Sequence, residues 1–237
     1  MVLVLTIGFF INFEYFRKIP PEITPTPILS TVLPLSPTPT LLPTATPIPD
    51  TYLIKNFPFE SQAPFANWDQ LHDEACEEAA IILVYYYLNH QSLDADIMEE
   101  QIQKMVSFEI ENYGSHHDLT IKETAKLAED FYGMSNFEIQ DDITIQDIKR
   151  EVANNQPVIV PTAGRLLGNP YFRSPGPIYH MLVVIGFEGK TIIVQDIGTR
   201  RGDHYEYNEK ILFNAIHDWN GSPENIEGGG KKMLVFD

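Results

Sequence analysis

The spacing of apolar residues changes part-way along the chain, from a helical period to the short runs typical of strands. The helical period predicts helices over about 74–89, 93–108, 120–133 and 144–155, with a further one over 208–219. Short apolar runs predict strands over 52–60, 137–139, 157–162, 180–187, 190–196 and 232–236. Helices followed by a mostly antiparallel sheet indicate an α+β domain.

Local signals mark several of the predicted helix ends. Thr120 and Glu123 form a capping-box pattern, and Gly133 follows as a stop. Ser92 or Asp94 is expected to cap the second helix. The first helix is apolar nearly all round, so we expect it to be buried in the middle of the domain.

Two segments precede the predicted domain at 51–237. Residues 1–13 are almost wholly apolar and are followed by Arg17 and Lys18. They are too few for the roughly 20 apolar residues of a spanning helix, so we interpret 1–19 as the truncated end of a membrane anchor or signal segment. Residues 20–50 repeat Pro-Thr steps, which favour an extended, disordered linker outside the cell.

Charge and cysteine content narrow the class of protein. The formal net charge of −17 argues against a nucleic-acid partner. The single cysteine excludes an internal disulfide, so stability must come from a hydrophobic core. We expect a monomer without a cofactor, whose contact with the membrane is through the N-terminal segment.

That cysteine, Cys76, lies where a polar loop turns into the first helix. The positive end of the helix dipole and the free N–H groups there favour thiolate over thiol. Cys76 is therefore either a packed core residue or a nucleophile. The acidic residues Glu77 and Glu78 suit a helix start but oppose a nearby thiolate, so the pKa of the thiol would depend on a cationic partner.

The two strands around Glu188-Gly189 predict a hairpin that supplies such a partner. With the turn centred on Glu188, His180 lies opposite Asp196, close enough for the imidazole to meet the carboxylate. An aspartate in that position fixes the ring tautomer and stabilises the imidazolium. The order Cys, His, Asp along the chain is that of papain-like hydrolases.

These residues carry a family resemblance. The runs 57–62, 76–79, 180–186 and 194–199 resemble the C39-like cysteine peptidases, relatives of papain in fold, over about 52–237. The resemblance implies a central nucleophile helix packed on the sheet. It also implies that Cys76 is the nucleophile, His180 the general base and acid, and Asp196 the residue that orients it. A glutamine would donate to the oxyanion with the Cys76 N–H; Gln62 is favoured, and Gln70 is the alternative.

Other polar residues receive less specific roles. The runs His116-His117-Asp118 and His217-Asp218 lack a partner cluster at metal-site spacing, so loop and helix-end roles are expected and no metal site is predicted. His72 is either a surface residue or a substrate contact. Within the Gly- and Pro-rich loop 163–179, the segment 164–172, which includes Arg165, is a candidate substrate-binding lid.

The sequence therefore predicts a bacterial, extracytoplasmic cysteine peptidase that cleaves peptide bonds through an acyl-enzyme. It would be tethered at the cell surface or secreted. Two alternatives stay open. One is a cell-wall peptide amidase or acyltransferase with the same triad, and the other is an inactive binding domain that keeps the fold.

Overall fold

The structure, a computed structural model, describes residues 47–236. The predicted anchor or signal at 1–19 and all but the end of the linker at 20–50 lie outside these residues. Within the part of the chain that is described, no helix is long and apolar enough to cross a membrane.

The strands between residues 47 and 236 form one antiparallel sheet. Its order is β2-β7-β3-β4-β5-β6, and β1 pairs with the far end of β4. The strands are β1 Thr51–Leu53, β2 Phe137–Asp141, β3 Val158–Ala163, β4 Tyr179–Glu188, β5 Thr191–Gln195, β6 Tyr205–Asn208 and β7 Lys232–Phe236. β4 is the centre of this arrangement, since it pairs with β3, β5 and β1.

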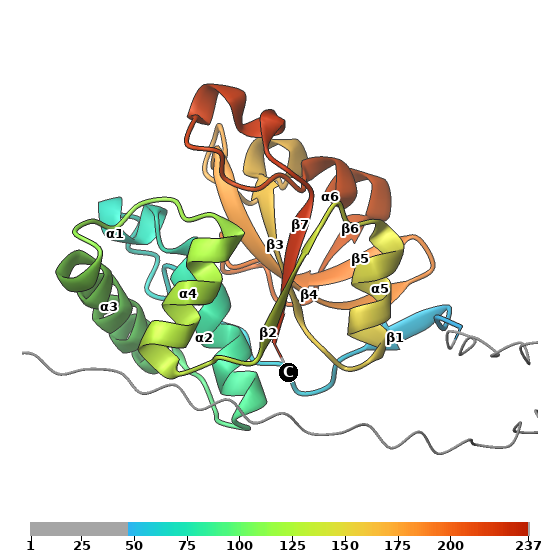
Figure 1. The fold of residues 1–237 in the computed structure, drawn as a ribbon, viewed down its shortest axis with the longest axis horizontal. Coiled ribbons are helices and arrows are strands. Elements are labelled where there is room, and N and C mark those ends of the chain that lie inside the picture. The colour runs from blue at the N-terminus through green and yellow to red at the C-terminus, as the bar shows by residue number, and fades with distance from the viewer. Residues whose placement is uncertain (1–46, 237) are drawn as a thin grey trace, which may run out of the picture. The chain divides into compact units, whose positions relative to one another are not determined.

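The helices mostly precede the sheet in the chain. They are α1 Gln70–Asp73, α2 Cys76–Leu88, α3 Ala95–Asn112, α4 Ile121–Tyr132, α5 Ile145–Ala153 and α6 Glu209–Ala215, with 3₁₀ turns η1 Gly164–Leu167 and η2 Pro223–Gly228. In Figure 1, α1 to α4 gather beside the sheet, whereas α5 and α6 lie against the strands. The predicted α+β class, with a helical first half on an antiparallel sheet, is confirmed.

Several element bounds differ from prediction for local reasons. The strand expected over 52–60 ends at Leu53, because Asn56 turns the chain with a φ of 56° and Pro58 has no N–H to donate. The helix expected to reach 219 stops at Ala215, since Ile216 is extended and bridges to Thr162 in β3. The strand β6 was not predicted.

The predicted helix ends are accurate where a cap specifies them. Thr120 and Glu123 form both hydrogen bonds of the capping box of α4, and Gly133 ends that helix at a φ of 72°. Asp94, rather than Ser92, caps α3 by accepting from the Ile97 N–H.

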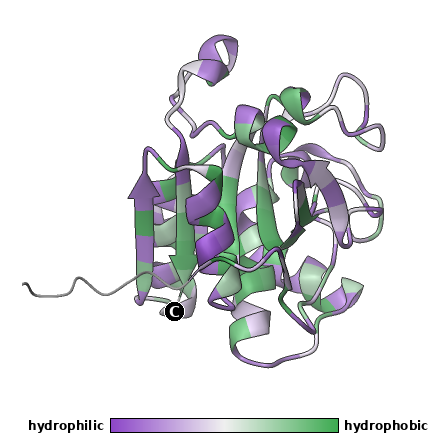
Figure 2. Ribbon diagram, turned by 90° about the vertical axis from the view of Figure 1, so that its right-hand side faces the viewer, coloured by the Kyte–Doolittle hydropathy of each residue, from purple (hydrophilic) through white to green (hydrophobic). Residues whose placement is uncertain are grey.

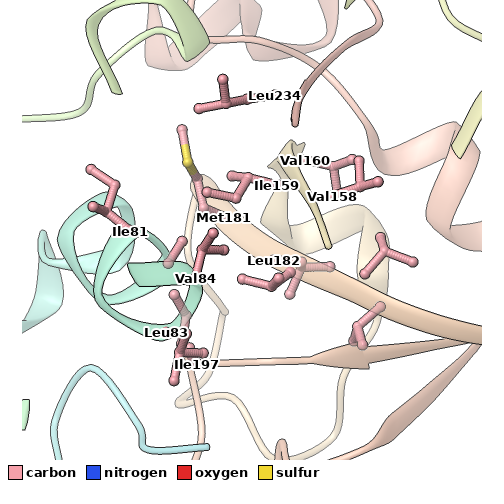
Figure 3. Packing of buried hydrophobic residues seen from close by; sticks show 14 of the residues in the cluster. Ile81, Leu83, Val84, Val158, Ile159, Val160, Met181, Leu182, Ile197 and Leu234 are labelled. Atoms are coloured by element: carbon pink, nitrogen blue, oxygen red, sulfur yellow. The ribbon is translucent and has the colours of Figure 1, made fainter. Parts of the chain in front are cut away.

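The core lies where α2 packs against β4. Figure 3 shows Ile81 and Val84 of α2 on the side of the sheet where Met181 of β4 and Ile159 of β3 lie. The middle strands are correspondingly apolar in Figure 2. Because α2 is buried nearly all round, its first residue, Cys76, is fixed relative to the strand that carries His180.

The predicted register of the β4–β5 hairpin is wrong. Val183 pairs with Gln195 and Glu188 pairs with Thr191, so the turn lies at Gly189 and Lys190, and a bulge interrupts the ladder between Val184 and Gly186. Asp196 therefore follows the end of β5 and is not directly opposite His180 in the ladder.

Candidate active site

His180 and Asp196 meet despite the changed register. Asp196 begins the loop after β5, and its carboxylate turns back so that Oδ1 accepts from His180 Nε2 at 3.0 Å. Both side chains are buried. Because Nε2 carries the proton shared with Asp196, the nitrogen left with a free lone pair is Nδ1. The pair therefore has the arrangement of a general base held by a carboxylate.

Asp196 is held in place by three further donors. Its Oδ2 accepts from the Tyr207 hydroxyl at 2.6 Å and from Asn169 Nδ2 at 2.8 Å, and Oδ1 also accepts from the Gly198 N–H at 3.2 Å. Burial and then the charge of Asp196 raise the pKa of Tyr207, so the phenol remains a donor. A buried carboxylate with this many donors has a fixed orientation.

Two neighbours shape the space around the imidazole. The ring of Phe172 meets that of His180 edge-on, with centroids 5.4 Å apart. Gly198 is the second neighbour, because a Cβ at this position would come within 2.8 Å of His180 Cε1. The ring can occupy its position only because residue 198 has no side chain.

Cys76 is the first residue of α2, as predicted, and its side chain is buried. Within residues 47–236 its thiol donates to Glu77 Oε2 at 2.9 Å, and no hydrogen bond joins it to His180. Burial, followed by the charge of Glu77, raises the pKa of the Cys76 thiol well above its usual range. In this conformation the sulfur is a protonated thiol.

Glu77 is itself an unusual carboxyl group. It is buried, and its second oxygen, Oε1, accepts from the Leu119 N–H at 2.6 Å. Burial and then the charge of Asp118 raise the pKa of Glu77 to about 8. The predicted unfavourable effect of the acidic helix start on a thiolate is thus explained by a direct contact between Glu77 and Cys76.

Gln62 and Gln70 occupy different environments. Gln62 is buried, and its backbone N–H donates to Ile197 O, next to Asp196. Its Nε2 donates to His72 O at 2.8 Å, while its Oε1 is buried without a partner among the described residues. Gln70 is exposed at the start of α1.

A cleft of about 880 Å³ opens beside His180. Gln62, His180 and Gly198 line it, together with the loop residues from Pro170 to Tyr179, of which Pro170 to Phe172 belong to the predicted lid. On the helical side, Asp73 and Glu74 also line the cleft, whereas Cys76, the residue two positions on, is not among the described lining residues. The histidine therefore faces the cleft and the thiol lies buried beside it.

The remaining candidates have structural partners. His72 is buried, not at the surface, and its ring nitrogens lie 2.7 Å from Asp69 and 2.9 Å from Glu99. Asp218 accepts from the Ile121 N–H at the start of α4. Arg165 donates to Gly176 O within its own loop.

The residues that sequence reasoning missed are those that hold Asp196. Tyr207 lies on the unpredicted strand β6, and Asn169 lies in the loop interpreted only as a lid. Neither residue belongs to a motif. The one signal for them was the expectation that a buried aspartate at a strand end needs hydrogen-bond donors from neighbouring side chains.

These features define a papain-like fold with a buried cysteine at a helix start and a His-Asp pair on the sheet. A sequence profile of the Peptidase_C39 like family matches residues 54–222, and the chain belongs to that family of cysteine peptidases. No match to a curated protein was found.

One solved structure with a TM-score above 0.5 supports the fold. A protein from Bacillus anthracis described as a C39-like peptidase aligns with a TM-score of 0.52 and 14% identity, covering 79% of this chain and 98% of that one. Xylellain, a cysteine protease from Xylella fastidiosa, aligns less well, with a TM-score of 0.45 and 10% identity over 81% of this chain and 87% of its own.

Proposed function

We propose that the chain is an active extracytoplasmic cysteine peptidase in which Cys76, His180 and Asp196 form the catalytic triad. The observation that carries the proposal is the His180–Asp196 pair. Its carboxylate is buried and fully hydrogen-bonded, and its imidazole borders a cleft with Nδ1 free to accept a proton. A domain kept only for binding has no need of this arrangement.

The chemistry follows from these positions. His180 Nδ1 removes the Cys76 proton, and the thiolate attacks the carbonyl carbon of the scissile peptide bond. The oxyanion is stabilised by the Cys76 backbone N–H, which has no partner within α2, and by the side-chain amide of Gln62. The imidazolium then protonates the leaving amine, and water, deprotonated by His180, releases the acyl group from the sulfur.

The first step requires the thiol to change partner. In the described conformation Cys76 donates to Glu77, so its Sγ must turn from that carboxyl group towards His180 before attack. The Gln62 amide must likewise release His72 O to donate to an oxyanion. We propose that substrate entering the cleft favours both rearrangements, which makes the described state a resting state.

Family membership supports a peptide substrate. Acidic side chains, among them Asp73 and Glu74, and basic ones, among them Arg173 and Arg201, line the cleft, and Asp73 pairs with Arg173 at 3.4 Å. A lining with charges of both signs suits a peptide with charged side chains or termini. The location outside the cytoplasm is proposed from the apolar residues 1–13 and the Pro/Thr-rich linker alone.

The test is digestion of a defined peptide library by the full chain and by Cys76→Ala and His180→Ala variants. We expect cleavage by the parent protein and none above background by either variant. Thermal unfolding would confirm that the variants fold. A folded parent that cleaves no peptide, or a His180→Ala variant as active as the parent, would overturn the proposal.

A further inference from the structure

Three potential metal ligands converge near the start of α2, outside the proposed triad. Glu78 comes from α2, Glu109 from the end of α3, and His116 from the loop between α3 and α4. One ligand atom from each lies within 4.8 Å of the others. Glu78 and Glu109 are buried, and the His116 side chain is only 10% exposed.

The cluster lacks the hydrogen bonds that its burial calls for. Among the described residues, neither carboxyl oxygen of Glu109 has a hydrogen-bond partner, nor does Glu78 Oε2 or His116 Nε2. Buried polar atoms without partners are rare because leaving each unsatisfied costs about 1–3 kcal/mol. Four such atoms in one place call for either a proton shared between the carboxyl groups or a bound cation.

The approach of His116 to Glu78 has the geometry of two ligands around one centre. Nε2 lies 3.1 Å from Glu78 Oε1, yet the pair is not aligned as a hydrogen bond. Ligand atoms that share a tetrahedral ion at about 2.0–2.2 Å are themselves separated by roughly 3.3–3.6 Å. The observed contact is close to that separation, and a carboxyl oxygen of Glu109 lies within 4.8 Å of both atoms.

We propose that Glu78, Glu109 and His116 bind a divalent transition-metal ion of the Zn²⁺ type. The imidazole nitrogen favours such an ion over Ca²⁺ or Mg²⁺, which prefer oxygen ligands. Three protein ligands leave a coordination position for water. The ion would join α2, α3 and the 113–120 loop, whose Leu119 N–H is already held by Glu77. This inference does not depend on the proposed peptidase activity.

A shared proton is the alternative explanation. Burial raises the pKa of Glu78 to about 8 and that of Glu109 to about 10, so two neutral carboxyl groups could hydrogen-bond to each other. That arrangement satisfies the carboxyl oxygens only in part and leaves His116 Nε2, 3.1 Å from Glu78 Oε1, without an aligned hydrogen bond. A cation satisfies all three side chains, which is why the geometry favours it.

The experiment is calorimetric titration of the metal-stripped full chain, without a histidine tag, with Zn²⁺, Mn²⁺, Ca²⁺ and Mg²⁺. We expect one Zn²⁺ per chain with micromolar or tighter affinity, and much weaker binding of Ca²⁺ and Mg²⁺. Loss of a direct ligand in Glu109→Gln or His116→Ala should weaken Zn²⁺ binding by at least about 100-fold, since even residues behind the ligands contribute 10–100-fold. The neighbouring exposed residue supplies the matched control, and His117→Ala should bind as the parent does.

A Cys76→Ala variant separates this site from zinc bound by the thiol. Stoichiometric Zn²⁺ binding that persists in Cys76→Ala and disappears in Glu109→Gln supports the site. Binding that disappears in Cys76→Ala and persists in Glu109→Gln, or no stoichiometric binding to the parent, overturns it. Anomalous scattering at the zinc edge would locate the ion directly, and a peak away from His116 would also overturn the proposal.

Discussion

The position of the His180 ring can be tested by adding one methyl group. In a Gly198→Ala variant the new Cβ would lie 2.8 Å from His180 Cε1, 2.9 Å from Nε2 and 2.9 Å from Phe172 Cε1. Favourable contacts between carbon atoms are about 3.5–4.0 Å, so the ring must retreat by roughly 0.7 Å or more. The bond from Nε2 to Asp196, 3.0 Å in the parent, would then stretch beyond hydrogen-bonding range.

The expected effect is on catalysis more than on folding. A misplacement of about 1 Å in a catalytic group costs on the order of 100-fold, so kcat/KM for a cleaved library peptide should fall about 100-fold. Overpacking should lower the free energy of unfolding by about 1–3 kcal/mol, which thermal or denaturant unfolding measures. The Gly230→Ala variant is the control, because its Cβ would meet nothing closer than Lys232 Cε at 3.4 Å.

The reasoning would be refuted by a Gly198→Ala protein with the kcat/KM of the parent. Displacement of the His180 ring would also be ruled out as the cause if Gly230→Ala lost as much activity, because any added methyl group would then have the same effect.

Three further substitutions test separate parts of the site. Glu77→Gln removes a negative charge that helps to raise the pKa of the Cys76 thiol. The pH profile of thiol alkylation should therefore move to lower pH by about one unit or more. An unchanged profile would show that the charge has no influence on the thiol. Tyr207→Phe removes the 2.6 Å hydrogen bond that the Tyr207 hydroxyl donates to buried Asp196. The variant should lose about 1–3 kcal/mol of unfolding free energy and should also lose activity. A fully stable and fully active variant would contradict the role assigned to Tyr207. Gln62→Ala should lower kcat by about 100- to 1,000-fold, whereas Gln70→Ala should leave kcat unchanged. The reverse result would assign the oxyanion donor to Gln70.

The sequence predicted helix starts and ends most accurately, because a few residue types at those positions specify the local backbone geometry. The capping box at Thr120, the left-handed stop at Gly133 and the start of α2 near Cys76 all follow from short-range geometry. The pairing of His180 with Asp196 was also predicted, but through a register that is wrong. The contact forms because Asp196 leaves the ladder and turns back, which strand alternation cannot describe.

What sequence reasoning missed depends on side chains brought together from distant segments. Tyr207 and Asn169 reach Asp196 from a strand and a loop that carry no motif. The neighbours of His116 could not be predicted either, because Glu78 and Glu109 are single positions on two helices. Only the packing of α2 on α3 makes them adjacent.

The central claim is that Cys76 and His180 act as one catalytic pair. The most direct measurement is the rate of Cys76 alkylation at neutral pH by an iodoacetylated library peptide, which itself enters the cleft, in the parent and in His180→Ala. The account predicts rapid, selective labelling of the parent and loss of labelling in His180→Ala, since the thiolate exists only when the imidazole takes its proton. Equal labelling of the two proteins, or a parent that does not react, would contradict it.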